Sequence, residues 1–269
     1  MSSRLEAILN STRIRVDRDR SATGRQALEK RASEHTPRGF RRALRERSQT
    51  QSAVIAELKR ASPSKGLIRG DFPVSQLAHE LAHAGATCLS VLTEPEYFQG
   101  SLANLEIASH ATSLPCLRKD FVVDEYQIIE ARAHRADAIL LIVAALTDAE
   151  LRNFNTFARQ LELDVLVEVH NAEELDRALQ SGCTELIGVN NRNLHTFEVS
   201  LETSLDLIQC MPADSVRIAE SGIDSSSSIA RLREAGFDGF LIGESLMRAE
   251  RPGDALRALL ESKQAVRAV

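Results

Sequence analysis

The chain has 269 residues, a formal net charge of −5 and 43% hydrophobic residues, which is enough apolar material for one large domain or two small ones. Aromatic residues make up only 4% and Trp is absent, so the exposed aromatic faces on which single-stranded nucleic acids stack are scarce. No apolar run approaches the roughly 18 residues of a membrane span, and the first residues lack the apolar core of a signal peptide. This composition favours a soluble, cytoplasmic protein without a membrane partner and excludes a mini-protein.

The first 50 residues are basic. They hold thirteen Lys or Arg against six Asp or Glu, a formal balance of +7, so the remainder of the chain carries −12. A basic arm on an acidic body is compatible with nucleic-acid binding, with cover over an anion-binding site, or simply with solvated helical faces. We expect residues 1–50 to form a helical extension that packs over the mouth of the following domain, the end at which its functional site opens.

From about residue 52, short apolar runs alternate with longer amphipathic stretches. The runs predict strands at 54–58, 88–92, 115–118, 138–143, 164–169, 185–189, 216–219 and 238–242. The intervening patterns predict helices at 75–85, 101–112, 124–135, 148–161, 171–182, 200–210, 224–236 and 253–264. Eight apolar strands, each followed by a helix, indicate a parallel sheet closed into an α/β (β/α)8 barrel, which we assign to residues 51–269 as a single domain.

Four of the predicted strands carry charged or amide side chains that burial alone does not explain. In the first, the period of two places Glu57 and Lys59 on the face toward the barrel axis. Buried charges cost several kcal/mol unless they are paired or functional. Three later strands lead into polar residues at the end where barrel enzymes carry their active sites: these are Lys119 and Asp120, then Glu168, then Asn190, Asn191 and Arg192. We interpret this set as an acid–base site without a metal.

The last two strands lead into small residues, at Ser221-Gly222 and Gly243-Glu244. Backbone N–H groups at the starts of the following helices can bind phosphate, and barrels of this kind commonly hold phosphate there. Glycine is also common at strand ends for structural reasons alone. The prediction of a phosphate site therefore depends on the location of these residues after strands seven and eight, and not on their residue type.

Two further patterns favour structural roles. His79, Glu80 and His83 match the zinc-protease pattern H-E-x-x-H, but their helix should turn both histidines outward, away from the strand ends. The four cysteines have no C-x-x-C spacing, and we expect them to be reduced residues in or near the core: Cys88, Cys116, Cys183 and Cys210.

Several segments together resemble the indole-3-glycerol phosphate synthase family of tryptophan biosynthesis. They are VIAELKRASPSKG, SVLTEPEYFQGS, LRKDFVVDEYQI, LLIVAAL, LVEVH, IGVNNRNL, AESGI and LIGESLM. The resemblance spans about residues 50 to 250. It implies closure of the pyrrole ring of 1-(2-carboxyphenylamino)-1-deoxyribulose 5-phosphate, a phosphorylated small molecule, with release of CO2 and water and with no cofactor.

The resemblance also implies a role for each site residue. Lys119 is the leading acid, Lys59 a second cation, Glu168 a base or acid for later proton transfers, and Glu57 orients the lysines. Asn190, also counted as catalytic, would position the substrate, Arg192 would assist on its carboxylate side and Ser62 would hold polar groups. The phosphate would be bound, mainly through backbone N–H groups, by Ser221, Gly222, Gly243 and Glu244. Which lysine protonates which oxygen stays open, and a carboxylate at Glu244 is unexpected beside a phosphate.

Three other interpretations remain. A sister phosphate-binding barrel, such as the isomerase of the preceding step, would not be expected to combine Glu57 and Lys59 with Lys119. A silent barrel that only binds a phosphorylated metabolite would not need acid–base residues. The interpretation as a nucleic-acid-binding module depends on the basic arm alone. We expect no nucleic-acid partner, and we expect the protein to be a monomer.

Overall fold

The computed structural model describes residues 4–194 and 196–261, which form a closed barrel of eight parallel strands in the order β1-β10-β9-β8-β7-β6-β5-β4. The strands are β1 Ala53–Leu58, β4 Cys88–Leu92, β5 Cys116–Lys119, β6 Ala138–Ile142, β7 Asp164–Val169, β8 Leu186–Asn190, β9 Val216–Glu220 and β10 Gly239–Ile242. The eight predicted strands and the barrel are therefore confirmed, with strand ends that differ by at most one residue.

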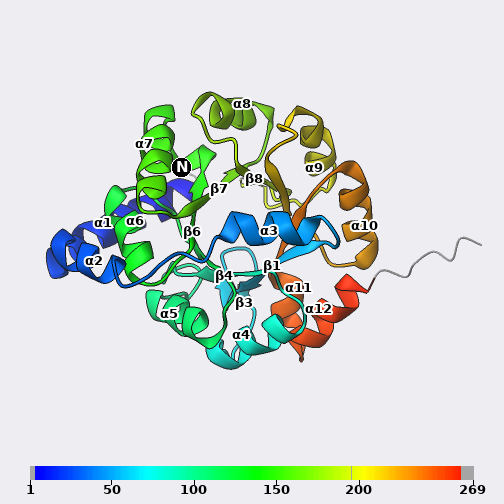
Figure 1. Ribbon diagram of the computed structural model, residues 1–269, viewed down its shortest axis with the longest axis horizontal. Coiled ribbons are helices and arrows are strands. Elements are labelled where there is room, and N and C mark those ends of the chain that lie inside the picture. The colour runs from blue at the N-terminus through cyan, green and yellow to red at the C-terminus, as the bar shows by residue number, and fades with distance from the viewer. Residues whose placement is uncertain (1–3, 195, 262–269) are drawn as a thin grey trace, which may run out of the picture.

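Helices surround the barrel and connect successive strands (Figure 1). They are α4 Val74–His83, α5 Leu102–Ala111, α6 Glu125–Ala133, α7 Asp148–Gln160, α8 Ala172–Gln180, α9 Glu202–Leu207, α10 Ser226–Ala235, α11 Glu244–Arg248 and α12 Pro252–Leu260, with the 3-10 turns η1 Val143–Ala145 and η2 Ile208–Cys210. Capping side chains start several of them, including a complete capping box from Thr147 and Glu150 at α7. The end of the predicted helix 253–264 lies outside the described residues.

Two small elements were not predicted. The connection after β1 contains a short antiparallel hairpin, β2 Ala61–Ser62 and β3 Gly66–Leu67, and α11 is an extra short helix after β10. Both lie at the carboxyl ends of the strands, where they add residues to the mouth of the barrel.

Alternation along β1 divides its side chains between two cores, as the sequence predicts. Val54, Ala56 and Leu58 belong to the core between strands and helices, whereas Ala53 and Ile55 belong to the core inside the barrel. Glu57 follows on the inner side and is 3% exposed. The interior is therefore apolar at the strand starts and charged at the strand ends.

The amino-terminal extension contains three helices with three different positions. α3 (Phe40–Ser48) lies across the end of the barrel where the strands begin (Figure 1). Its Phe40 and Leu44 have no exposed surface and complete the interior core. The backbone N–H of Arg41 also donates to Asp164, the first residue of β7, at 2.8 Å.

The other two helices lie elsewhere. α2 (Arg25–Ala32) packs against α6, burying Leu28 and Ala32. α1 (Arg4–Ala22) contributes Arg4, Leu5 and Ile8 to the cavity at the strand carboxyl ends. Of the three helices, only α1 lies at the mouth of the barrel, where the whole extension was expected. The prediction is wrong for α3, because its apolar side chains are buried at the opposite end of the barrel.

The position of α3 predicts a stability effect. Replacing Phe40 by Ala leaves a cavity in the barrel interior, so Phe40→Ala should lower the free energy of unfolding by about 3–5 kcal/mol in urea denaturation. Ile14→Ala on α1 is the matched control, since Ile14 is 73% exposed. Equal, small losses in the two variants would show that α3 does not close the barrel.

Candidate active site

A cavity of about 690 Å³ opens at the carboxyl ends of the strands. All eleven site residues expected from the sequence line it: Glu57, Lys59, Ser62, Lys119, Glu168, Asn190, Arg192, Ser221, Gly222, Gly243 and Glu244. They come from six of the eight barrel strands and the connections that follow them, so barrel closure brings together residues up to 187 positions apart.

Two lysine–glutamate pairs form the charged floor of this cavity. Lys59 Nζ lies 2.5 Å from Glu57 Oε1, and Lys119 Nζ donates to Glu168 Oε2 at 2.9 Å. The side chains of the two lysines are only 17% and 14% exposed. Pairs this poorly hydrated interact more strongly than surface ion pairs, and each lysine is held beside a carboxylate.

Each member of the second pair fixes the charge of the other. Burial by itself would lower the pKa of Lys119, but the carboxylates of Glu168, Glu220 and Glu57 raise it well above its usual range. Burial would raise the pKa of Glu168, but Lys119 and then His170 bring it well below its usual range. At neutral pH the free site therefore holds a protonated lysine beside an ionised carboxylate.

Glu220 is a site residue that the sequence interpretation missed. It ends β9, is 2% exposed, and its Oε2 lies 3.8 Å from Lys119 Nζ. Burial and the neighbouring Glu168 raise its pKa to about 8, against the opposing effect of Lys119. The sequence contains the same signal for Glu220 as for Glu168, a carboxyl group at the end of an apolar strand. The Ser-Gly pair that follows Glu220 was interpreted as a phosphate site, and Glu220 itself was not assigned a role.

Two glycines make room for buried carboxyl groups. A Cβ atom on Gly188 of β8 would overlap Glu220 Oε1, and a Cβ atom on Gly243 would overlap Glu57 Oε1. Gly243 therefore has a packing role at the acid–base site in addition to its predicted role near phosphate. A substitution there displaces Glu57 and does not test phosphate binding alone.

The part of the cavity around Glu244 is rich in cations. The Glu244 carboxylate lies 3.4 Å from Arg192, 3.2 Å from Arg248 and 4.0 Å from Lys65. This explains how a carboxylate is tolerated where the sequence suggested a phosphate: it is surrounded by positive charge. Ser221 and Gly222 nearby both have positive φ angles, 66° and 75°.

Apolar side chains form a further part of the cavity wall. Phe98 and Phe121 line the cavity with ring centroids 6.2 Å apart, next to Leu140 and Ile142. Asn190 accepts a hydrogen bond from the Arg192 backbone N–H at 3.0 Å, which fixes the loop that carries Arg192. The cavity thus combines an aromatic-compatible wall, an acid–base floor and a cationic side.

Asp120 has a structural contribution. It accepts hydrogen bonds from Arg15 at 2.8 and 3.2 Å, from Arg118 at 3.1 Å and from Thr93 at 2.7 Å. Burial raises the pKa of Asp120, but the two arginines more than offset this and lower it. Through Arg15, this carboxylate ties α1 to the residue directly after Lys119.

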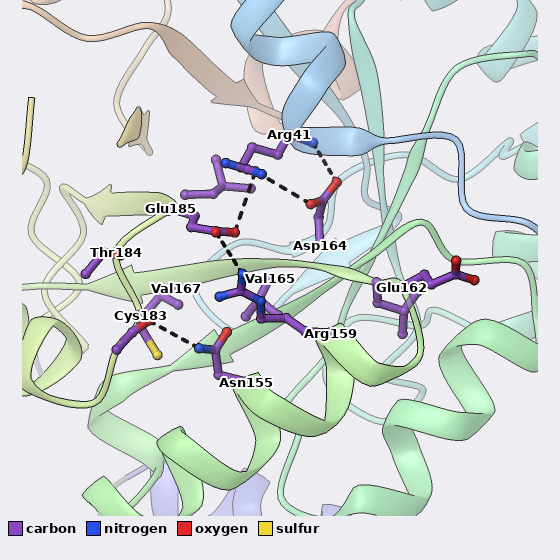
Figure 2. A pocket seen from close by; sticks show the side chains of 13 residues that line it. Arg41, Asn155, Arg159, Glu162, Asp164, Val165, Val167, Cys183, Thr184 and Glu185 are labelled. Carbon is purple, nitrogen blue, oxygen red and sulfur yellow. Dashed lines mark hydrogen bonds and ion pairs between the residues drawn. The ribbon is translucent and has the colours of Figure 1, made fainter. Parts of the chain in front are cut away.

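A second, smaller cavity of about 190 Å³ lies near the strand starts, between α7, α3 and the loop that follows α8 (Figure 2). Its charged groups are paired with one another: Arg159 with Glu185 at 2.9 Å, and Arg41 with Asp164 and Glu185 at 3.8 and 3.7 Å. Asn155 donates to the Gly182 carbonyl at 3.3 Å. These contacts describe an ion-pair network between helices and loops.

The H-E-x-x-H pattern and the cysteines have structural surroundings. His79 and His83 are exposed on α4, and the Glu80 carboxylate accepts the Gly253 N–H at 2.8 Å at the start of α12. Cys88, Cys116 and Cys183 are buried free thiols, whereas Cys210 is exposed. Across residues 4–194 and 196–261, no group of three or more His, Cys, Asp and Glu is arranged to hold a metal ion, and no helix is long and apolar enough to cross a membrane.

The raised pKa of Glu220 predicts a pH-dependent stability. Folding favours its protonated form, so the stability it contributes is complete below the unfolded pKa of about 4.3 and is lost as the pH rises through about 8. Glu220→Gln removes this loss. The melting temperature of the variant relative to the unchanged protein should therefore increase between pH 6 and pH 9; a constant difference would contradict the assignment.

Comparisons with known proteins agree with this site. The family model for indole-3-glycerol phosphate synthase matches residues 5–259. An indole-3-glycerol phosphate synthase of Koribacter versatilis is 59% identical over 260 residues, covering 97% of this chain and 100% of that protein.

Solved structures share the fold at low identity. Thiamine phosphate pyrophosphorylase from Pyrococcus furiosus matches with a TM-score of 0.58 and 16% identity, covering 79% of this chain and 95% of that one. A 3-hexulose-6-phosphate synthase matches with a TM-score of 0.60 and 13% identity, covering 77% and 97%. The fold is thus widely shared, whereas the full-length matches in sequence are specific: the chain belongs to the indole-3-glycerol phosphate synthase family.

Proposed function

We propose that this chain converts 1-(2-carboxyphenylamino)-1-deoxyribulose 5-phosphate to indole-3-glycerol phosphate, CO2 and water by acid–base catalysis with Lys119 and Glu168. The observation that carries the proposal is the 2.9 Å contact between these two buried groups at the floor of the cavity. The apolar wall suits the anthranilate ring of the substrate, and the cationic side suits its phosphate.

Ring closure begins with attack of the electron-rich aromatic carbon on the ketone of the sugar chain. A new carbon–carbon bond forms, and the ketone oxygen takes a proton from the Lys119 ammonium group to become a hydroxyl. Loss of CO2 then returns the bonding electrons to the ring. Lys119 fits this role because its raised pKa keeps it protonated until negative charge develops on the ketone oxygen beside it.

Dehydration needs a second acid–base event. The hydroxyl leaves as water with a proton, and a base removes a proton from the sugar chain to complete the double bond. Glu168 is the proposed base, since it is ionised and lies beside Lys119. Lys59, oriented by Glu57, is the proposed cation for the substrate carboxylate and the departing hydroxyl.

The phosphate is proposed to lie against the backbone around Ser221, Gly222 and Gly243, next to Glu244. Lys65 and Arg248 add positive charge at this place, which composition alone did not single out. Arg192 lies on the same side, and Ser62 on the loop after β1 is proposed to hold other polar groups of the substrate.

The basic extension supports this proposal better than nucleic-acid binding. Several of its arginines contact carboxylates of the barrel, including Arg15 with Asp120 at 2.8 Å and Arg38 with Asp137 at 2.5 Å. Their charge therefore joins the extension to the acidic body. A cytoplasmic enzyme is proposed, since its substrate would carry two anionic groups and be made and used inside the cell; a monomer is also proposed.

The direct test is incubation with the substrate while indole fluorescence is followed, for which a chain without Trp gives a low background. Indole formation supports the synthase. Binding of the substrate without turnover would support a silent barrel, and salt-dependent oligonucleotide binding would support a nucleic-acid module.

Lys119 should affect the chemical step more than binding. Lys119→Met should reduce kcat by about 10²–10⁴-fold with a much smaller change in KM, because it removes a proton donor used in the transition state. Lys119→Arg should not restore activity, since guanidinium is a far weaker acid. Near-normal single-turnover rates in folded Lys119→Met would transfer the role to another acid, with Lys59 the first candidate.

Lys59 should affect both kinetic constants. Lys59→Met removes a cation proposed to contact the substrate carboxylate, so KM should rise while kcat falls. Steady-state kinetics on both methionine variants separates the two lysines. Identical patterns in the two variants would contradict the division of roles.

A further inference from the structure

His170 is a buried histidine that the proposed mechanism leaves without a task. It directly follows β7, two residues after Glu168, and its side chain is 8% exposed. It lies behind Glu168, outside the set of residues that line the cavity. A buried, charged histidine is costly unless its surroundings stabilise the charge, so its neighbours are informative.

Glu174 fixes one side of the imidazole ring. Its Oε2 lies 3.0 Å from His170 Nδ1 and also accepts the His170 backbone N–H at 2.9 Å. Glu174 is itself held by the start of α8, where Asn171 caps its backbone N–H at 2.9 Å and donates to its Oε1 at 3.0 Å. An ionised carboxylate only accepts hydrogen bonds, so Nδ1 carries a proton and the ring has one orientation.

Glu168 lies at the other side of the ring. His170 Nε2 is 3.4 Å from Glu168 Oε1, while the second oxygen of Glu168 accepts from Lys119 at 2.9 Å. With Nδ1 already protonated, an attractive contact to Glu168 requires a proton on Nε2 as well. Burial alone would lower the pKa of His170, but the neighbouring carboxylates of Glu168 and Glu174 raise it to about 9.

We propose that His170, held as an imidazolium by Glu174, is a positioning residue that attracts one oxygen of the ionised Glu168 carboxylate and so keeps the other oxygen aimed at Lys119. The inference rests on the proposed role of Glu168 as the base. Under this proposal, negative and positive groups alternate in space from the start of α8 to the floor of the cavity, in the order Glu174, His170, Glu168, Lys119.

The kinetic test compares His170→Gln with the unchanged protein as a function of pH. At pH 6 to 8 the variant should lose roughly tenfold in kcat, the effect of removing one neighbouring charge, with KM changed less than about threefold. The ratio of the two kcat values should approach one as the pH rises through about 9, because the unchanged His170 then loses its own proton. Glu220 and Lys119 are present in both proteins, so the pH dependence of the ratio reports on His170 and on its coupling to these groups through Glu168.

Two further variants keep this test decisive. Glu174→Gln should show the same pH trend with a smaller loss, which covers the case in which His170→Gln does not fold. His134→Gln is the matched control, since His134 is also poorly exposed and lies 3.0 Å from a carboxylate, Glu106, at the far end of α6. A ratio that stays constant with pH would reduce His170 to a packing role and overturn the proposal.

An NMR titration separates this inference from the proposed activity. The His170 ring should titrate near pH 9 in the free protein, and Glu168→Gln should lower that value by about one unit or more. If the coupling is present but the chain has no synthase activity, the proposed function fails alone. An unchanged His170 titration in Glu168→Gln would contradict the contact on which the positioning role depends.

Discussion

The mouth of the barrel depends on one constraint: charges removed from water must be paired. Lys119 with Glu168 and Lys59 with Glu57 meet this constraint within the cavity, and the first pair holds a protonated lysine beside an ionised carboxylate. Removing one partner of a buried pair costs about 3–5 kcal/mol because it strands the other charge. The same pairing that makes the site stable therefore supplies the acid and base that the chemistry needs.

Packing around the pairs follows from this constraint. Gly188 and Gly243 are required because Glu220 and Glu57 occupy the space that a side chain would take. Asp120, directly after Lys119, is held by Arg15 and Arg118, so the position of the lysine is linked to α1. At the other end of the barrel, Phe40 and Leu44 fill the apolar interior, which keeps water away from the lower layers of the strands.

The fold was largely predictable because each strand has a continuous apolar run and each helix has caps or an apolar face. The inward direction of Glu57 followed from the period of two along β1 alone. Glu220 and His170 were missed for a different reason: their meaning depends on which strands become neighbours after closure. Glu220 lies beside Lys119 only because β9 and β5 end in the same mouth, and His170 appears in the sequence as an ordinary residue before a helix cap. The position of α3 was also not predictable, since two apolar side chains on a basic helix do not reveal which end of the barrel they fill.

The central claim is that Lys119 and Glu168 work as one unit, and a double-mutant cycle in kcat/KM tests it most directly. Lys119→Met, Glu168→Gln and the double variant would be measured with the anilino-deoxyribulose phosphate substrate, after each protein is shown to be folded. If the two groups share one proton-transfer arrangement, the double variant should lose about as much activity as the more damaging single variant. Losses that multiply in the double variant would show two independent contributions and contradict the account.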